Sequence, residues 1–364
     1  MSGTATPVIA FLCFVVSFVA SGILMRIGLL PDRPNSRSLH TQVTPRSGGL
    51  AFQLPALLAL AFIWFNHPAP WIVAVLVGTI SFLGLGLLDD AFQLSPLVRL
   101  AVQIVVSTCL IYLAGPPTIA IFDFLILSGP AALVFQVVWV MVCINFFNFM
   151  DGMDGLAGLQ AIAFFAAGGL ILILQGDRPH MGQFMVCCAT SVVGFWIRNL
   201  KPSTLFMGDS GSYFCGFLIG FLPLIWHRPE DPGPILRFDG HRISSGVDFT
   251  LGIILFGPFL LDAGLTILRR LSERQNVFAP HRKHLYQALR LSGWSVYQVL
   301  GTYGIAMCLA TALATLRILV PISSDRLTAG AILVIVGFGF IYSAAVNRLA
   351  REHSDLSGSS NPEY

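Results

Sequence analysis

Long apolar segments alternate with short polar ones along the whole chain. A helix needs about 20 predominantly apolar residues to cross a bilayer, and the sequence predicts eleven such helices. Their expected ranges are 7–28, 49–65, 71–88, 97–114, 130–149, 157–175, 182–198, 211–226, 248–268, 296–318 and 328–347. The alternation typical of membrane-spanning strands is absent. The pattern therefore predicts an all-α polytopic membrane protein.

One apolar segment, GPPTIAIFDFLILSG at 115–129, is too short to span as a helix. Irregular backbone is tolerated inside a bilayer only where protein or water covers it. We therefore expect a small external hairpin or a re-entrant piece at this position.

Composition narrows the class of protein further. Of the 364 residues, 55% are hydrophobic and only 11% are charged, and the mean hydropathy is +0.78. A soluble domain carries about 25% charged residues, so we expect surrounding membrane lipid and no nucleic-acid partner. The cysteines lie in or beside apolar segments and form no CxxC, which indicates small core residues rather than disulfides or metal ligands.

The basic residues predict which side of the membrane each connection faces. No Lys or Arg precedes the first predicted helix and Arg26 follows it, which indicates an uncleaved helix that starts outside. Successive connections lie on alternate sides of the membrane, which puts most basic residues on the same side as Arg26. The basic residues on the opposite side are Arg178, Arg228, Arg237, Arg242, Arg317 and Arg326. The positive-inside rule then predicts a periplasmic N-terminus, a cytoplasmic C-terminus and a multi-pass protein of the bacterial inner membrane. We expect one transmembrane domain over 1–349 and a polar, disordered cytoplasmic tail over 350–364.

The stretch NFFNFMDGMDGLAG at 145–158 is the centre of the predicted site. It follows a membrane-length apolar segment, where polar side chains are costly unless they have a function. Asn145, Asn148 and Asp151 are spaced three apart and share one sector of any helix that continues through them. Asp154 keeps this spacing, but the neighbouring glycines favour a tight bend. Such a bend presents two carboxylates and open backbone to a ligand.

A second polar group, Asp89-Asp90, ends the third predicted helix. Adjacent carboxylates repel each other, so a pair at a membrane boundary indicates a bound cation or a base. Arg99 follows a few helical turns further on. An ordinary solvated helix end is the alternative interpretation.

Two more carboxylates fall on the predicted cytoplasmic side. Asp209 stands in a Gly-rich turn, GDSG, that opens a helix and suits a hard cation beside phosphate oxygens. Asp262 lies near the cytoplasmic end of its helix and must be paired or functional, with Arg269 and Arg270 as candidate partners.

Two basic connections suit contact with phosphate, because guanidinium groups match its geometry. The first is 31–49, which carries Arg46, and the second holds His281, Arg282, Lys283 and His284. The two histidines have the spacing of zinc ligands but lack a third soft ligand nearby, so phosphate contact is the preferred interpretation. A loop that is basic only through the positive-inside rule is the alternative for 31–49.

The segments DDAFQLSPLVR, NFFNFMDGMDGLAG, FMGDSGS and HRKH occur in an order found in one enzyme family. From about Pro31 to Gln287 the chain resembles the polyprenyl-phosphate N-acetylhexosamine-1-phosphate transferases, the superfamily of the MraY and WecA types within glycosyltransferase family 4. The resemblance implies transfer of a sugar 1-phosphate from a UDP-N-acetylhexosamine to undecaprenyl phosphate at the cytoplasmic face of the membrane. It also implies release of UMP and a need for Mg²⁺, with Mn²⁺ as a substitute.

Two departures bear on the branch of this superfamily. The MraY type has a lysine shortly after its Asp-Asp pair, whereas here Gln93 falls close by and Arg99 is expected to serve instead, as in WecA-like proteins. The family's basic segment usually ends in consecutive histidines, but here Leu285-Tyr286-Gln287 follows His284. That form resembles the transferases that initiate O-antigen synthesis with 6-deoxy-N-acetylhexosamines. Eleven spans and an external start also resemble the WecA branch.

The motifs imply a role for each candidate residue. Asp89 and Asp90 are the implied catalytic pair beside the lipid phosphate, and Asp209 and Asp89 are the implied metal ligands. Phe206 is a candidate for stacking on uracil. The full set of implied substrate-binding residues is Asn148, Asp151, Asp154, Phe206, Arg46, Asp262, His281, Arg282, His284 and Arg99.

Three other functions compete with this one. A phospho-MurNAc-pentapeptide transferase would act in peptidoglycan synthesis. A secondary transporter would use the carboxylates as ion sites, but such sites lie near the bilayer midplane, often between inverted repeats. A structural membrane protein leaves the aspartate clusters unexplained. The sequence leaves open which UDP-sugar is used, which polymer is initiated and whether the chain forms a homodimer.

The predicted topology can be tested with reporter fusions. Fusions after Arg46, Asp209 and Arg351 should all report the cytoplasm, because each point follows an odd number of spans from an external start. A periplasmic signal at any one of them would mean that a span has been miscounted.

Overall fold

The computed structural model describes residues 5–32, 43–114, 118–121, 125–176, 178–200, 202–226, 249–276 and 282–319, together with 336, 337, 339 and 343. The helices in these ranges are α1 (Ala5–Ile27), α2 (Gly48–Asn66), α3 (Pro70–Phe92), α4 (Pro96–Ala114), α5 (Gly129–Met150), α6 (Leu156–Gln175), α7 (Pro179–Asn199), α8 (Gly208–Ile225), α9 (Phe249–Ser272), α10 (Leu285–Leu291) and α11 (Val296–Leu319). The strands are β1 (Pro31–Asp32), β2 (Thr44–Pro45), β3 (Thr118–Ile121) and β4 (Leu125–Ser128).

The helices of the described residues confirm a mostly helical, polytopic membrane fold. All of them except the short α10 are long and apolar enough to cross a membrane, 10 in number. They coincide with the first ten predicted segments to within about one helical turn at each end. The eleventh predicted span, 328–347, lies mostly outside the described residues, and the tail at 350–364 lies wholly outside them.

Two short antiparallel ribbons interrupt the helical pattern. β3 pairs with β4 from Thr118↔Ser128 to Ile121↔Leu125, so the prediction of a hairpin within 115–129 is correct. β1 pairs with β2, a ribbon that the sequence did not predict. It brings Arg46 back beside the end of α1, where its amide donates to the carbonyl of Leu30 at 2.9 Å.

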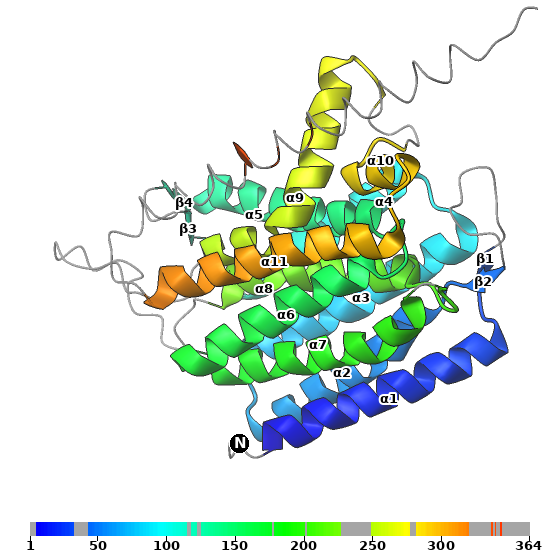
Figure 1. The fold of residues 1–364 in the computed structure, drawn as a ribbon. Coiled ribbons are helices and arrows are strands. Elements are labelled where there is room, and N and C mark those ends of the chain that lie inside the picture. The colour runs from blue at the N-terminus through cyan, green and yellow to red at the C-terminus, as the bar shows by residue number, and fades with distance from the viewer. Residues whose placement is uncertain are drawn as a thin grey trace, which may run out of the picture.

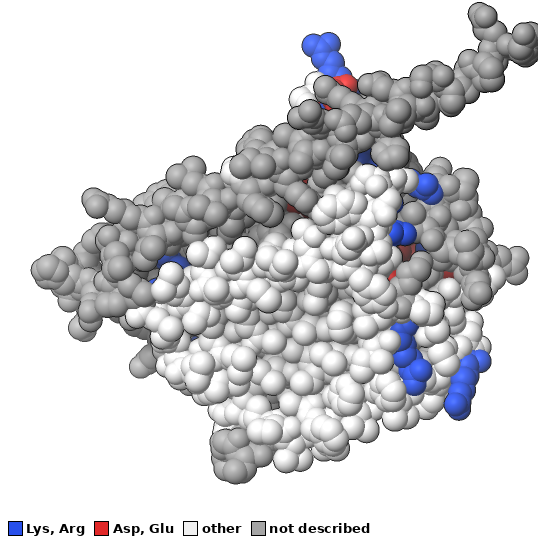
Figure 2. Space-filling view, viewed as in Figure 1, with Lys and Arg blue, Asp and Glu red and all other residues white. Residues whose placement is uncertain are grey.

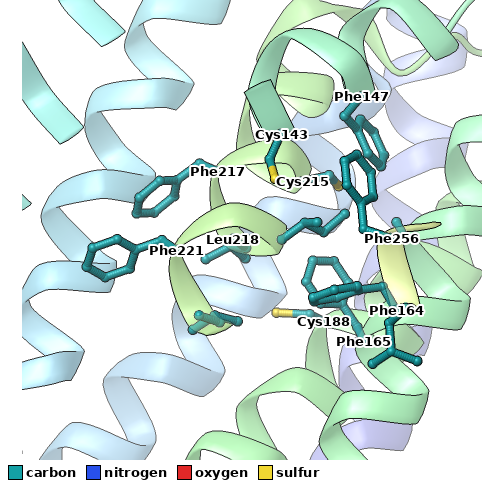
Figure 3. Packing of buried hydrophobic residues seen from close by; sticks show 14 of the residues in the cluster. Cys143, Phe147, Phe164, Phe165, Cys188, Cys215, Phe217, Leu218, Phe221 and Phe256 are labelled. Atoms are coloured by element: carbon teal, nitrogen blue, oxygen red, sulfur yellow. The ribbon is translucent and has the colours of Figure 1, made fainter. Parts of the chain in front are cut away.

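Helix α8 runs through the middle of the bundle (Figure 1). Every residue from Ser210 to Ile225 is buried, and α2, α3, α5 and α9 pack against it. A helix that is apolar on all sides requires such a position. In Figure 3, Phe217 and Phe221 point from α8 towards the pale blue helices. There Phe217 stacks on Phe82 of α3, with ring centroids 4.9 Å apart.

The outer surface of the bundle has the character expected of a surface in contact with lipid. Large apolar side chains such as Phe11, Phe65 and Leu174 are exposed, and soluble proteins rarely carry extensive patches of this kind. Figure 2 shows a broad uncharged band over the helices, with Lys and Arg gathered towards the end where β1, β2 and α10 lie in Figure 1.

The connections that follow α1, α3, α5, α7 and α9 meet at one end of the bundle, which we call the carboxylate end. Their contacts are direct. The Gly48 amide donates to the Phe206 carbonyl at 2.9 Å, and the hydroxyl of Tyr286 donates to the Phe149 carbonyl at 3.3 Å. Segments far apart in the sequence therefore build a single surface at this end.

Helices α3 and α8 approach each other most closely beside the Asp-Asp pair. A Cβ atom added at Gly86 would lie 2.3 Å from the Cα of Ser210 and 2.6 Å from the carbonyl oxygen of Asp209. The absence of a side chain at Gly86, one turn before Asp90, lets the two backbones touch. The spacing between the aspartates of α3 and Asp209 depends on this contact.

We predict that Gly86→Ala destabilises the protein and displaces Asp90 from α8. The matched control is Gly84→Ala in the same helix, where an added Cβ meets nothing within 4 Å. Alanine is favoured over glycine in helices by about 1 kcal/mol, so the control should melt at or above the wild-type temperature. Thermal unfolding in detergent measures both variants, and equal melting temperatures for them would contradict the close packing.

Candidate active site

Five aspartates gather at the carboxylate end from three separate parts of the chain. Asp89 and Asp90 belong to the last turn of α3, and Asp209 belongs to the first turn of α8. Asp151 and Asp154 lie in the turn between α5 and α6. The structure therefore brings together all five carboxylates that the sequence singled out around the motifs.

Asp90 caps the N-terminus of α8. Its Oδ1 accepts the Asp209 amide at 3.0 Å and its Oδ2 accepts the Ser210 amide at 3.2 Å. The first amides of a helix have no partner within the helix, and the helix dipole favours an anion there. Gly208 has φ +75°, a left-handed conformation that suits glycine, so the GDSG turn can present these amides to Asp90.

Asp89 has a different set of partners. Its Oδ2 accepts hydrogen bonds from the Tyr213 hydroxyl at 2.6 Å and from Nη1 of Arg99 at 3.0 Å, and its Oδ1 accepts the Leu94 amide at 2.9 Å. Arg99, which the sequence expects to serve in place of the MraY-type lysine, therefore lies against the first aspartate of the Asp-Asp pair. Gln93 ends α3 in a left-handed conformation, with φ 51°, which turns the chain so that the Leu94 amide reaches back.

Asn148 joins α5 to α8. Its Nδ2 donates to Oδ1 of Asp209 at 2.8 Å and to the Ser212 hydroxyl at 2.9 Å. Asn145, one turn earlier, bonds Gln103 of α4 instead, at 2.7 Å. Helix α5 ends at Met150, so the three polar residues predicted to share one sector have different positions. Asn145 contacts α4, Asn148 contacts Asp209, and Asp151 lies in the turn after the helix.

The turn at 151–155 is held by residues that the sequence did not single out. Gly155 has φ +79°, which confirms the predicted bend. Its amide donates to Oδ1 of Asn199 at 2.9 Å, and its carbonyl accepts from Nε1 of Trp196 at 2.7 Å. Nδ2 of Asn199 also donates to the carbonyl of Leu205 at 3.0 Å. Asn199 therefore ties this turn to the segment that precedes Asp209.

The segment before α2 carries Arg46 to the same place. The Gly48 and Gly49 amides donate to the carbonyls of Phe206 and Met207 at 2.9 and 2.8 Å, and the Phe206 amide donates to Pro45 at 2.8 Å. The Arg46 guanidinium lies 3.0 Å from the Asp32 carboxylate. These contacts bring Arg46 and half-buried Phe206 beside the carboxylates, as the motifs implied.

Negative charge exceeds positive charge among these groups. Burial and the charge of Asp209 hold the pKa of the Asp151 carboxyl well above its usual range. The charges of Asp90 and Asp154 add to this effect, while Arg46 opposes it. The set contains five carboxylates and two guanidinium groups, those of Arg46 and Arg99. A bound cation would relieve the repulsion.

The donor set suits Mg²⁺ completed by substrate. Mg²⁺ keeps several waters and is usually bound by one or two carboxylates together with phosphate oxygens. Within the described ranges, no group of three or more His, Cys, Asp or Glu is arranged to hold a metal unaided. There Oδ2 of Asp209 and both oxygens of Asp151 accept no hydrogen bond, whereas Asp89 and Asp90 use both of theirs. Asp209 and Asp151 are the residues best placed to hold the ion.

Asp262 anchors the basic segment. Its Oδ1 accepts the Leu285 amide at 2.8 Å, its Oδ2 accepts the Tyr286 amide at 3.3 Å, and the Tyr303 hydroxyl of α11 also donates to Oδ2. Nδ1 of His284 lies 3.5 Å away. The carboxylate thus holds the N-terminus of α10, a helix that the sequence did not predict. Arg269, a candidate partner of Asp262 in the sequence, forms an ion pair with Glu273 at 3.8 Å.

Through α10, Asp262 also supports the Asp-Gly turn. The Tyr286 hydroxyl donates a hydrogen bond to the Phe149 carbonyl. A Cβ atom added at Gly152 would lie 2.1 Å from the same Tyr286 hydroxyl. Arg282 and His284 are thereby kept at the carboxylate end, while His281 lies outside the described residues. Lys283 pairs with Glu273 at 2.8 Å.

We predict that Asp262→Asn releases α10 from α9. The introduced amide would face N–H and O–H donors, and an unmade buried hydrogen bond costs about 1–3 kcal/mol. Limited proteolysis should then cut faster between residues 273 and 295. The matched control is Thr266→Val, which removes one weak hydrogen bond of 3.3 Å from the Thr266 hydroxyl to the Asp262 carboxylate. This variant should resist proteolysis as well as the wild type does. Equal cutting of Asp262→Asn and wild type would contradict the anchoring role.

Comparison with known proteins shows similarity to one enzyme family. Residues 72–227 match the family model described as glycosyl transferase family 4. A Bacillus subtilis protein named "probable undecaprenyl-phosphate N-acetylglucosaminyl 1-phosphate transferase" is 28% identical over 77% of this chain and 75% of its own length. A decaprenyl-phosphate N-acetylglucosaminephosphotransferase of Mycobacterium leprae is 27% identical over 77% and 76%, respectively.

A third relative matches a larger share of the chain. The undecaprenyl-phosphate alpha-N-acetylglucosaminyl 1-phosphate transferase of Yersinia pestis is 27% identical over 85% of this chain and 81% of its own length. The family match spans the Asp-Asp pair, the Asp-Gly turn and the GDSG turn, which the structure assembles into one site. The family match and the similarity to these relatives over most of the chain support placing it in the polyprenyl-phosphate N-acetylhexosamine-1-phosphate transferase superfamily.

Proposed function

We propose that this protein transfers an N-acetylhexosamine 1-phosphate from a UDP-sugar to undecaprenyl phosphate and releases UMP. The reaction takes place at the cytoplasmic face of the bacterial inner membrane. The names of the relatives support the reaction class, since each is named for transfer to a polyprenyl phosphate.

The observation that carries the proposal is the convergence of five carboxylates and two arginines at one end of a membrane-spanning bundle. A membrane-borne phosphate and a soluble nucleotide sugar can meet only at such a boundary. A secondary transporter would place its charged residues near the bilayer midplane. Clustering at helix ends favours an enzyme.

Magnesium is part of this proposal. When bound, Mg²⁺ would offset the charge of the lipid phosphate and the diphosphate and would polarise the reacting phosphorus, with Mn²⁺ able to replace it. Asp209 and Asp151 would hold the ion. Asn148 fixes the orientation of the Asp209 carboxylate through its 2.8 Å hydrogen bond.

The remaining residues bind and orient the two substrates. The turn at 151–155 and Phe206 form the nucleotide-sugar half of the site, and the Phe206 ring stacks on uracil. Arg99 and Arg46 form the phosphate-binding half, since guanidinium groups suit phosphate oxygens. Arg282 and His284 border the site from the side of α10.

Direct attack is the simplest chemistry for this arrangement. A non-bridging oxygen of the lipid phosphate attacks the β-phosphorus of the UDP-sugar, and the bond from that phosphorus to the bridging oxygen breaks as UMP leaves. The attacking oxygen is already anionic near neutral pH, so no base has to remove a proton. Positioning and charge supply the rate enhancement. Asp89 and Asp90, with both oxygens engaged, act here by orienting other groups.

The sugar and the product polymer form the finer part of the proposal. The WecA-like features of the sequence and the segment Leu285-Tyr286-Gln287 after His284 favour initiation of an O-antigen-type polysaccharide, with N-acetylglucosamine or a 6-deoxy-N-acetylhexosamine as the sugar. A panel of UDP-sugars offered to the purified protein, with UMP release as the readout, would identify the preferred substrate.

We predict that wild-type protein releases UMP only when a UDP-sugar, undecaprenyl phosphate and Mg²⁺ are all present. Asp209→Asn should reduce turnover by about 100-fold or more, because removing a preorganised charge at the reacting centre typically has this effect. Omission of each component serves as the control. Stoichiometric UMP release without lipid, accompanied by a trapped sugar-phosphate on an aspartate, would overturn direct attack in favour of a covalent intermediate.

A further inference from the structure

Tyr213 stands at the junction of three helices and belongs to none of the motifs that identify the family. It lies one turn after Asp209 on α8, and its side chain is only 1% exposed. A buried tyrosine hydroxyl requires a hydrogen-bond partner. Here the hydroxyl donates to Oδ2 of Asp89 on α3 at 2.6 Å and accepts from Nη1 of Arg99 on α4 at 3.3 Å.

The same contacts divide the Arg99 guanidinium into a fixed edge and a free edge. Nη1 is held by Asp89 and by Tyr213. In the described part of the chain, Nη2 and Nε of Arg99 make no hydrogen bond, and the side chain is 29% exposed. Parallel N–H groups on one edge of a guanidinium match two phosphate oxygens. Arg99 therefore presents a pre-oriented fork for an anion.

The surroundings of Arg99 indicate from where the anion arrives. Phe92, Leu97 and Val98, which flank it at the end of α3 and the start of α4, are exposed by 72%, 77% and 48%. In a membrane-spanning bundle, exposed apolar residues at the ends of two helices contact lipid. A phosphate attached to a polyprenyl chain can approach along this surface, whereas a nucleotide sugar approaches from water.

We propose that Tyr213 is a positioning residue for the lipid substrate. Together with Asp89 it locks the Arg99 guanidinium in the orientation that receives the polyprenyl phosphate. The inference rests on the proposed function and adds to it a residue outside the motifs. It also gives Asp89 a defined role, which is to hold Arg99 rather than to accept a proton.

The central test is Tyr213→Phe in the purified full-length enzyme. The KM for undecaprenyl phosphate should rise by about tenfold, as expected for loss of one hydrogen bond to charged groups, with the KM for the UDP-sugar unchanged. The melting temperature should stay close to that of the wild type, because the ring is retained. Tyr112→Phe, a phenol-to-phenyl change at an exposed position of α4, is the matched control and should leave both KM values unchanged.

A double-mutant cycle shows whether Tyr213 acts through Arg99. If it does, Arg99→Ala and the double variant Tyr213→Phe/Arg99→Ala should have the same kcat/KM for the lipid substrate. Multiplicative losses would mean that Tyr213 acts independently of Arg99, and the inference would be wrong. It would also be overturned if Tyr213→Phe failed to fold, changed both KM values alike or changed neither. Absence of UMP release by the wild type with every UDP-sugar would count against the proposed function itself.

Discussion

Two hydrogen bonds from the first amides of α8 to the Asp90 carboxylate join the Asp-Asp pair of α3 to the GDSG turn. Helix α8 is buried along its length, so the position of its N-terminus is set by the surrounding helices and by this cap. A capping carboxylate contributes about 1 kcal/mol to helix stability. The larger consequence is geometric, because the cap places Asp209 against α3 and therefore close to Asp89.

The other contacts at the carboxylate end extend this arrangement outwards. Asn148 adds α5, Asn199 adds the end of α7 and Asp262 adds α10 through backbone amides. Each of these polar side chains joins two segments that are distant in the sequence. The site is therefore a property of the bundle, and a change in the packing of any one helix would alter the spacing of the carboxylates.

Much of this arrangement could be predicted from the sequence. The ten described spans followed from apolar length, because a helix that crosses a bilayer must satisfy its own backbone. The grouping of Asp89, Asp151 and Asp209 at one end followed from their positions at helix boundaries. The bend at Gly155 and the hairpin of β3 and β4 followed from local turn chemistry and segment length.

Other parts could not be predicted, because they depend on contacts between distant segments. Tyr213 and Asn199 look like ordinary residues at helix ends until folding brings α3 and the turn at 151–155 beside them. The role of Asp262 was ambiguous for the same reason, since its partners on α10 and α11 follow it by more than twenty residues. The identity of the sugar substrate could not be predicted from the sequence either, because it depends on how several segments close around a substrate.

We propose that the carboxylate end forms a single site for a nucleotide diphosphate and a cation. The most direct measurement is a cryo-EM map of the protein in a lipid nanodisc with UDP-N-acetylglucosamine and Mg²⁺. We expect density for the diphosphate between Asp209 and the turn at 151–155, with uracil against Phe206. Nucleotide density at the opposite end of the bundle, or near the bilayer midplane, would contradict it.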